Sequence, residues 1–268
     1  MATLMKKYQY LLTESKGPAL WITLNRPTTK NAFNLEMGKE LLDAMRAGIR
    51  DKQHAVIVLT GAGEAFSAGG DIKLMNQTPP KKHKDFFLEI SRLVNSTVLE
   101  MQSSPKPVIA AIPGYVGGVA FGLCLGTDLR IAATEACFNA ATIRIGLVAN
   151  GGATYFLPRL IGLARAAEIL FLGEVCSAQE ALNMGLINKV VDSKALEQTV
   201  QSWAEHLANL PRSALGRVKE LLNESSSNTL PRQLERERQS IAWSSTLPDF
   251  REGIEAFVQK RKGKFNQI

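Results

Sequence analysis

The sequence lacks the patterns that mark membrane proteins and secreted proteins. Among its 268 residues there is no run of about 18 apolar side chains, so no membrane span is expected. The lysines in the opening stretch "MATLMKKYQYLLTESKG" are not followed by a continuous apolar core. A signal peptide is therefore a poor interpretation, and residues 8–12 fit a first strand better.

Cysteine and histidine are scarce and scattered. The three cysteines, Cys124, Cys137 and Cys176, have no CxxC spacing, and we interpret them as buried thiols of a protein in the reducing cytoplasm. The three histidines show no metal-ligand pattern. Neither a metal nor a redox cofactor is therefore expected.

Positive charge is in modest excess, with 32 Lys and Arg residues against 25 Asp and Glu residues and a formal net charge of +7. Much of this excess lies in "QKRKGKF" near the C-terminus. A nucleic-acid-binding protein would show affinity that falls steeply with salt. However, the sequence has no aromatic residues interleaved with basic ones and no recognition-helix motif, so no nucleic acid is expected as a partner. The remaining interpretations are a solvated surface and a site for a small phosphorylated ligand.

Short apolar strands alternate with helices up to residue 158. The predicted strands are residues 8–15, 19–25, 55–61, 106–114 and 129–135, and the predicted helices are residues 34–51, 82–102 and 118–128. Such alternation predicts an α/β fold whose parallel strands are joined by right-handed crossovers. After residue 158 the pattern is helical almost throughout. We therefore predict a core over residues 1–200 and a helical segment over residues 201–268.

Two glycine-rich loops share one design. "FSAGGDI" (66–72) follows a strand, and "GYVGGVAFG" (114–122) also follows a strand and opens a helix. A helix N-terminus offers unpaired N–H groups and the positive end of the helix dipole. Two such N–H groups from separate, converging loops would form an oxyanion hole. The alternative is that each loop is an ordinary tight turn.

Six segments of the sequence resemble, in order, segments of the enoyl-CoA hydratase/isomerase (crotonase) family: "ITLNRPTTKNAFN", "VLTGAGEAFSAGGDIK", "KPVIAAIPGYVGG", "RIGLVANGGATYFLPRLIG", "SAQEALNMGLINKVV" and "FREGIEAFVQKRKGKF". They span nearly the whole chain, which makes the resemblance far more specific than a single glycine pattern. Within the family, "LNRPTTKNAFNLEM" and "SNTLPRQLERERQ" are most similar to the isomerases of the phenylacetate pathway, which act on epoxyphenylacetyl-CoA and unsaturated acyl-CoAs. The resemblance implies a crotonase-like spiral of ββα repeats with a helical C-terminal oligomerisation segment, assembled as a homotrimer or a dimer of trimers.

The resemblance also implies a ligand, an acyl-CoA thioester that carries coenzyme A as part of the substrate. Its carbonyl would lie in an oxyanion hole formed by the backbone N–H groups of Ala68 and Val119. Phe257 and Lys260 match residues that reach a neighbouring subunit's CoA, although Lys260 is equally interpreted as a solvated helix-end lysine. The CoA-contacting stretch falls on Arg26, Lys30, Ala68, Gly70, Asp71 and Ile72.

The acidic residues of the family are missing. The two glutamates of the hydratases fall on Gly122 and Thr142, and the aspartate of the phenylacetate-type isomerases falls on Asn150 in "GLVANGGAT". None of these side chains can transfer protons as a carboxylate does, which argues against hydration by two carboxylates. The Asn150 amide could bond the substrate or orient a water. Alternatively, asparagine occupies this position because it suits the backbone of such turns.

Three explanations remain open for the missing base. The first is that another residue supplies it, and the candidates are His83, Asp85, Glu89, Tyr115 and Tyr155. The second is that the enolate forms by loss of carbon dioxide, which needs no strong base. The third is that the chain binds acyl-CoA without catalysis. The sequence therefore predicts an acyl-CoA-processing enzyme that isomerises or hydrates an enoyl-CoA and is nearer to the isomerases. Decarboxylation and simple binding are the alternatives.

Overall fold

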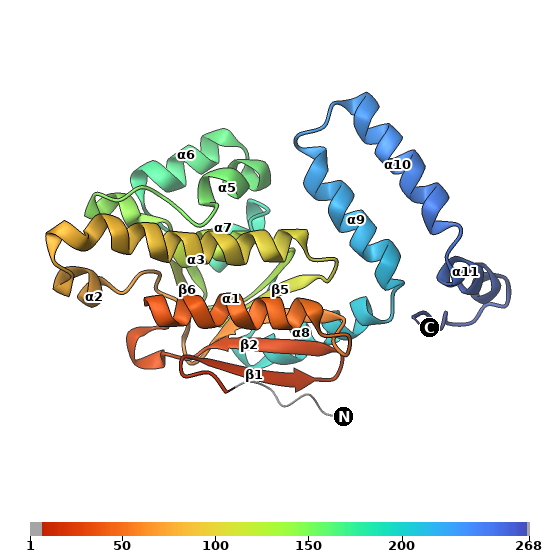
Figure 1. The fold of residues 1–268 in the computed structure, drawn as a ribbon, viewed down its shortest axis with the longest axis horizontal. Coiled ribbons are helices and arrows are strands. Elements are labelled where there is room, and N and C mark those ends of the chain that lie inside the picture. Colours follow the sequence, from red (N-terminus) through yellow and green to blue (C-terminus); the bar gives the residue numbers. More distant parts are fainter. Residues whose placement is uncertain (1–6, 267–268) are drawn as a thin grey trace.

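Two β-sheets form the centre of the computed structural model, which describes residues 7–266 (Figure 1). The larger sheet has the strand order β1-β2-β3-β5-β7-β10. Its strands are β1 (Leu11–Lys16), β2 (Ala19–Leu24), β3 (Val56–Gly61), β5 (Val108–Ile112), β7 (Leu129–Ala133) and β10 (Lys189–Val191). Only the β1–β2 pair is antiparallel, and the neighbours from β2 to β10 are parallel. The parallel pairing confirms the crossovers predicted from the sequence.

The second sheet has the strand order β4-β6-β8-β9. Its members are β4 (Ala65–Ser67), β6 (Tyr115–Gly117), β8 (Cys137–Asn139) and β9 (Val175–Ser177). Three times along the chain, a long strand of the first sheet is followed by a short strand of the second and then by a helix. This winding is the spiral of ββα repeats that the family resemblance implies, and the structure confirms it.

Helices cover both faces of the larger sheet because its strands alternate their apolar side chains between the two faces. On one face α1 (Leu35–Arg50) and α3 (His83–Ser103) pack over residues such as Ile22 and Leu59. On the other face α8 (Leu196–Ala208) covers Val58 and Ile109. The remaining helices of the body are α2 (Ile72–Gln77), α4 (Gly118–Leu125), α5 (Ala153–Ile161), α6 (Leu163–Leu172) and α7 (Ala178–Asn183). Between residues 7 and 266, no helix has the length and hydropathy needed to cross a membrane.

The last three helices form an arm that extends away from the body (Figure 1). They are α9 (Arg212–Ser225), α10 (Leu230–Ser244) and α11 (Pro248–Val258). The predicted boundary after residue 200 falls inside α8, whose Val200 and Ala204 both lie in the core cluster on the sheet. We therefore place the start of the arm after α8, because α8 belongs to the body by its packing.

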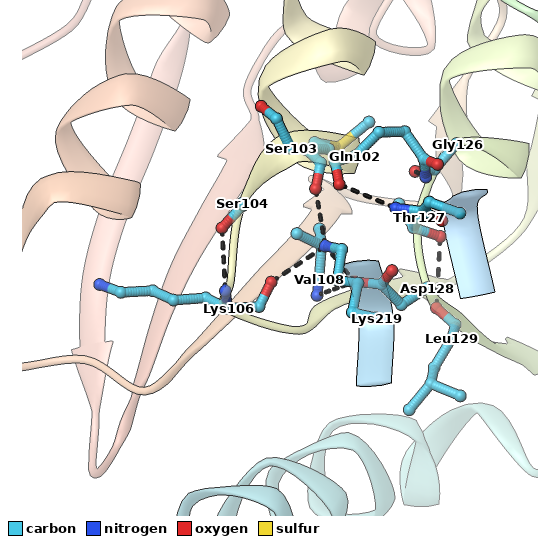
Figure 2. Close-up of polar contacts among 12 residues, drawn as sticks. Gln102, Ser103, Ser104, Lys106, Val108, Gly126, Thr127, Asp128, Leu129 and Lys219 are labelled. Atoms are coloured by element: carbon cyan, nitrogen blue, oxygen red, sulfur yellow. Dashed lines mark hydrogen bonds and ion pairs between the residues drawn. The ribbon is translucent and has the colours of Figure 1, made fainter. Parts of the chain in front are cut away.

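A buried ion pair joins the arm to the body (Figure 2). The Lys219 ammonium on α9 donates to the Asp128 carboxylate at 2.7 Å and to the Met101 and Lys106 carbonyls at 2.6 and 3.1 Å. The same Asp128 oxygen accepts from the Val108 N–H at 2.7 Å. Burial lowers the pKa of Lys219 and raises the pKa of Asp128, while their mutual attraction opposes both shifts. The arm is thus joined to the body by an ion pair and by hydrogen bonds to two backbone carbonyls.

Sequence patterns missed the second sheet and strand β10. Strands β4, β6, β8, β9 and β10 have three residues each, too few to show the alternation that identifies a strand. Both β9 and β10 lie in the region expected to be helical almost throughout, and that expectation is wrong there. Each of them pairs with strands that are distant in the sequence, so its own residues do not reveal it.

Candidate active site

A cavity of about 350 Å³ lies where the two glycine-rich loops meet helix α3 and the turn that contains Asn150. Its wall is mostly apolar, with Phe33, Phe86, Phe87, Ile90, Leu147 and Val148 among the lining residues. The polar side chains on the wall are Ser91, Tyr115, Asn139, Thr142 and Asn150. Within the described part of the chain, no carboxylate, histidine, lysine or arginine lines the cavity. The site can therefore receive an apolar acyl group but has no charged side chain to offer it.

Residues 69–71 present one backbone N–H to this cavity. The Phe33 N–H donates to the Gly69 carbonyl at 2.7 Å, and the Phe33 carbonyl accepts from the Asp71 N–H at 3.1 Å. In such a parallel bridge, the residue between the two bonded neighbours points its own N–H and C=O to the other side. Gly70 is that residue and lines the cavity, so its N–H is directed away from Phe33.

The structure contradicts the prediction that Ala68 supplies a free donor. The Ala68 N–H already donates to the Lys30 carbonyl at 2.8 Å. The motif match to the family placed the donor two residues too early. The bridge with Phe33 decides which amide faces the cavity, and a motif match does not show that bridge.

The second N–H comes from Val119, in the first turn of α4. The first N–H groups of a helix have no partner within it, and no side chain among the described residues caps α4. Val119 is buried and lines the cavity. The two loops converge there, since a Cβ placed on Gly118 would lie 3.9 Å from the Gly70 nitrogen. Two N–H groups, on Gly70 and Val119, are thus placed on one cavity wall.

The three positions where the family resemblance implies acidic residues all lie near the cavity. The Asn150 side chain donates to the Ser91 hydroxyl at 3.3 Å, and the Thr142 hydroxyl donates to the Ala140 carbonyl at 3.3 Å. Gly122 faces the backbone of the turn, and a Cβ there would lie 2.4 Å from the Asn150 carbonyl oxygen and 2.6 Å from that of Gly151. No larger side chain fits at Gly122 unless the turn moves.

Most of the alternative bases do not reach the cavity. The Glu89 carboxylate pairs with Arg92 at 2.7 Å, and Asp85 is exposed. The His83 ring contacts the Met75 carbonyl at 3.2 Å, and the Tyr155 hydroxyl contacts Ser226 at 3.3 Å. Of the five candidates, Tyr115 is the one on the cavity wall.

The residues expected to contact CoA fall into separate groups. Gly70 and Ile72 line the cavity, and Lys30 is exposed. Arg26 is instead paired with Asp71 at 3.0 Å, and Asp71 also caps α2 by accepting from the Leu74 N–H. This pair holds the glycine-rich loop in place. A motif alone cannot show whether a residue has such a structural role or contacts the ligand.

The arm residues lie far from the cavity of their own chain. Phe257 is 86% exposed, and Lys260 is also exposed just beyond α11. Figure 1 places α11 at the end of the molecule opposite α2, which borders the cavity. Within one chain these two residues therefore do not contribute to the site.

The described residues form no metal-binding cluster. Across residues 7–266, no three side chains of His, Cys, Asp or Glu are grouped closely enough to hold a metal ion. The three cysteines are free thiols. The polar groups on the described cavity wall are backbone amides, hydroxyls and side-chain amides.

Comparison with known proteins agrees with this geometry. A model of the enoyl-CoA hydratase/isomerase family matches residues 14–268. The 1,2-epoxyphenylacetyl-CoA isomerase of Escherichia coli is 37% identical over 257 residues, covering 96% of this chain and 98% of that protein. The trans-2-decenoyl-[acyl-carrier-protein] isomerase of Streptococcus mutans is 30% identical and covers 91% of this chain and 93% of its own length. The crystal structure of an enoyl-CoA hydratase from Bacillus anthracis superposes with a TM-score of 0.91 at 30% identity, over 97% of this chain and 100% of that one.

Proposed function

Since the chain belongs to the enoyl-CoA hydratase/isomerase family and is an enzyme of that type, we propose that the N–H groups of Gly70 and Val119 bind the carbonyl oxygen of an acyl-CoA thioester. This oxygen gains negative charge when the thioester becomes an enolate. Preorganised donors stabilise that charge, and removing one donor typically costs about 3 kcal/mol of barrier. The observation that supports the proposal is that Gly70 and Val119 both line one apolar cavity, in loops that approach each other closely.

The reaction we propose is double-bond isomerisation of an enoyl-CoA rather than hydration. Hydration in this family needs two carboxylates, and the backbone of the Asn150 turn occupies the space that a glutamate at Gly122 would need. Two of the relatives compared above are named as isomerases. The Phe86 and Phe87 rings meet edge to face with centroids 5.4 Å apart, which suits an aromatic or aliphatic acyl group.

Decarboxylation is a second candidate, favoured by one observation. No carboxylate lines the cavity within the described residues. A reaction that forms the enolate without a general base is therefore compatible with the side chains on the cavity wall. A β-carboxylated acyl-CoA would supply the electron pair by losing carbon dioxide, and the same two N–H groups would hold the oxygen.

The proposal extends to a homotrimer or a dimer of trimers. The arm exposes large apolar side chains, including Ile241 at 71%, Phe257 at 86% and Val258 at 74%. Exposed apolar surface of this kind often marks a protein interface. In such an assembly Phe257 and Lys260 would reach the CoA of a neighbouring subunit, with Lys260 placed to meet a phosphate.

Three substrates separate these reactions. Purified protein is mixed with crotonyl-CoA, a 3-enoyl-CoA or methylmalonyl-CoA, and the products are followed by mass spectrometry. Conversion of the 3-enoyl-CoA alone supports isomerisation, and conversion of methylmalonyl-CoA alone supports the second candidate. Affinity without turnover would identify a binding protein, and calorimetry that detects no affinity for any CoA thioester would contradict the whole proposal.

A pair of variants tests the donor itself. Gly70→Pro removes the N–H, whereas Gly70→Ala keeps it and adds a Cβ whose nearest neighbour is the flexible end of Met75. We expect Gly70→Pro to lower turnover about 100-fold or more and Gly70→Ala to cost much less. Equal losses in both variants would show that crowding, and not the N–H, is responsible.

A further inference from the structure

Tyr115 is the one side chain with an ordinary titratable proton on the described cavity wall. It is the first residue of β6, just before the loop that carries the Val119 N–H. The proposed function assigns it no role. An enolate nevertheless has to exchange a proton at its α-carbon, and nothing else described on this wall is suited to that step.

The Tyr115 ring lies against Gly117. A Cβ placed on Gly117 would be 2.5 Å from the ring carbon Cε1 and 2.9 Å from the hydroxyl oxygen, so the ring can take this position only because residue 117 has no side chain. The same point lies 3.0 Å from the Ala68 carbonyl oxygen. The hydroxyl is thus held between the two loops that carry the Gly70 and Val119 amides.

Strand pairing fixes the other side of the hydroxyl. Gly117 is in register with Asn139 of β8, and the Asn139 side chain forms a hydrogen bond with Tyr115. Asn139 is buried and also lines the cavity. The tyrosine is therefore oriented by a second polar group that is itself fixed in a sheet.

The surroundings keep this hydroxyl protonated at neutral pH. Burial raises the pKa of Tyr115, and the neighbouring Cys137 thiol acts in the same direction. The hydrogen bond with Asn139 and the positive charge of Arg144 oppose the shift without reversing it. A neutral phenol can donate a proton to a carbanion or an enolate, whereas a carboxylate would have to be protonated first.

We propose that Tyr115 is a catalytic residue that exchanges a proton with the α-carbon of the thioester bound at Gly70 and Val119. This inference rests on the proposed function. In the forward step the Tyr115 O–H bond breaks, the electron pair of the enolate C=C bond forms a C–H bond, and the thioester C=O bond is restored. The tyrosinate then takes a proton from water. In the reverse step the tyrosinate removes the α-proton and the electron pair returns to the enolate.

Deuterium uptake tests this step without knowledge of the natural substrate. Phenylacetyl-CoA is incubated with the protein in D₂O, deuterium at its α-carbon is read by mass spectrometry, and its binding is measured by calorimetry. Tyr115→Phe keeps the ring and removes the hydroxyl. The matched control is Tyr155→Phe, whose hydroxyl contacts Ser226 outside the cavity.

We expect wild-type protein and Tyr155→Phe to catalyse the exchange, and Tyr115→Phe to lose about 100-fold in exchange rate with little change in Kd. Because removal of the α-proton needs the tyrosinate, the wild-type rate should rise with pH up to the raised pKa of Tyr115, and Tyr115→Phe should lose this dependence. Exchange by Tyr115→Phe at the wild-type rate would overturn the assignment, as would binding without exchange by the wild type. Absence of binding would instead refute the proposed function.

Discussion

The arm junction and the cavity differ in charge: the junction encloses a pair of charged side chains, and the described cavity wall has none. At the junction, Lys219 and Asp128 are both largely enclosed, and each has several hydrogen-bond partners (Figure 2). The described cavity wall has no charged side chain and instead offers the N–H groups of Gly70 and Val119. An unpaired buried charge is very costly, so an interior keeps a permanent charge only with its partner. The cavity supplies only dipoles, which leaves room for a charge that the ligand develops during reaction.

The largest effect should come from breaking the charge pair at the junction. Lys219→Met leaves the Asp128 carboxylate buried without its ammonium partner, and we expect a loss of about 3–5 kcal/mol in the free energy of unfolding. Urea denaturation followed by circular dichroism measures it. The double variant Lys219→Met/Asp128→Asn should lose less stability. The amide that replaces the carboxylate can still accept from the Val108 N–H, and no unpaired charge is left buried.

An exposed ion pair on the same arm is the control. Arg238 and Glu235 contact each other at 2.7 Å on the surface of α10. Arg238→Met should leave the denaturation midpoint nearly unchanged, because surface pairs contribute little. A similar loss in both single variants would show that burial does not set the value of the junction pair.

A smaller effect is expected from placing a carboxylate in the cavity. Asn150→Asp puts a base beside Ser91, whose hydroxyl can donate to it, without adding bulk. We expect isomerisation of a 3-enoyl-CoA to rise about 100-fold over wild type, the usual contribution of a positioned general base. The rate is read from the appearance of the 2-enoyl product by mass spectrometry.

Gly122→Glu is the contrasting variant. It adds the same kind of charge where the turn backbone leaves no space. We expect it to destabilise the protein by about 1–3 kcal/mol or more and to give no gain in rate. If Gly122→Glu restored hydration and Asn150→Asp did nothing, the described position of the turn could not be that of the working enzyme.

The smallest effect should appear at the exposed end of the arm. Hydrogen bonds from Arg261, together with one from the Lys264 N–H, lower the pKa of Glu252 from 4.5 to about 2. Because the folded-state pKa is depressed, these contacts stabilise the arm fully above the ordinary glutamate value and less as the pH falls toward 2. The protection of the Lys264 amide proton against exchange, measured relative to the intrinsic exchange rate at each pH, should therefore fall in acid, and Glu252→Gln should reduce that pH dependence. Equal protection of this amide in both proteins at every pH would contradict this.

The long elements of the fold can be predicted from the sequence because their patterns are long enough to show a period. Helix α1, for example, begins at the side-chain cap of Asn34 and keeps one apolar face for 16 residues. The three-residue strands of the second sheet cannot be found this way, although they align the loops of the site. Their pairing is set by the chain around them and not by their own residues.

The sequence predicts which loops form the site, but not which backbone N–H groups and side chains face the cavity. Both glycine-rich loops and the Asn150 turn do meet at one cavity, as the family resemblance implies. The choice between Ala68 and Gly70 depends on a single bridge to Phe33, and the exclusion of Glu89 depends on its pairing with Arg92. The bridge joins residues that are far apart in the sequence, so a linear motif does not encode it. The Glu89–Arg92 pair is local, with a spacing of three residues on one helix, and that spacing could have been used to set Glu89 aside.

The close approach of Gly122 to the Asn150 turn also limits how this protein can change by mutation. Gly122→Glu is harmful as long as the turn keeps this place, because the new Cβ would lie 2.4 Å from the Asn150 carbonyl oxygen. A glutamate at this position therefore requires at least two coordinated changes, the new side chain and a displaced turn.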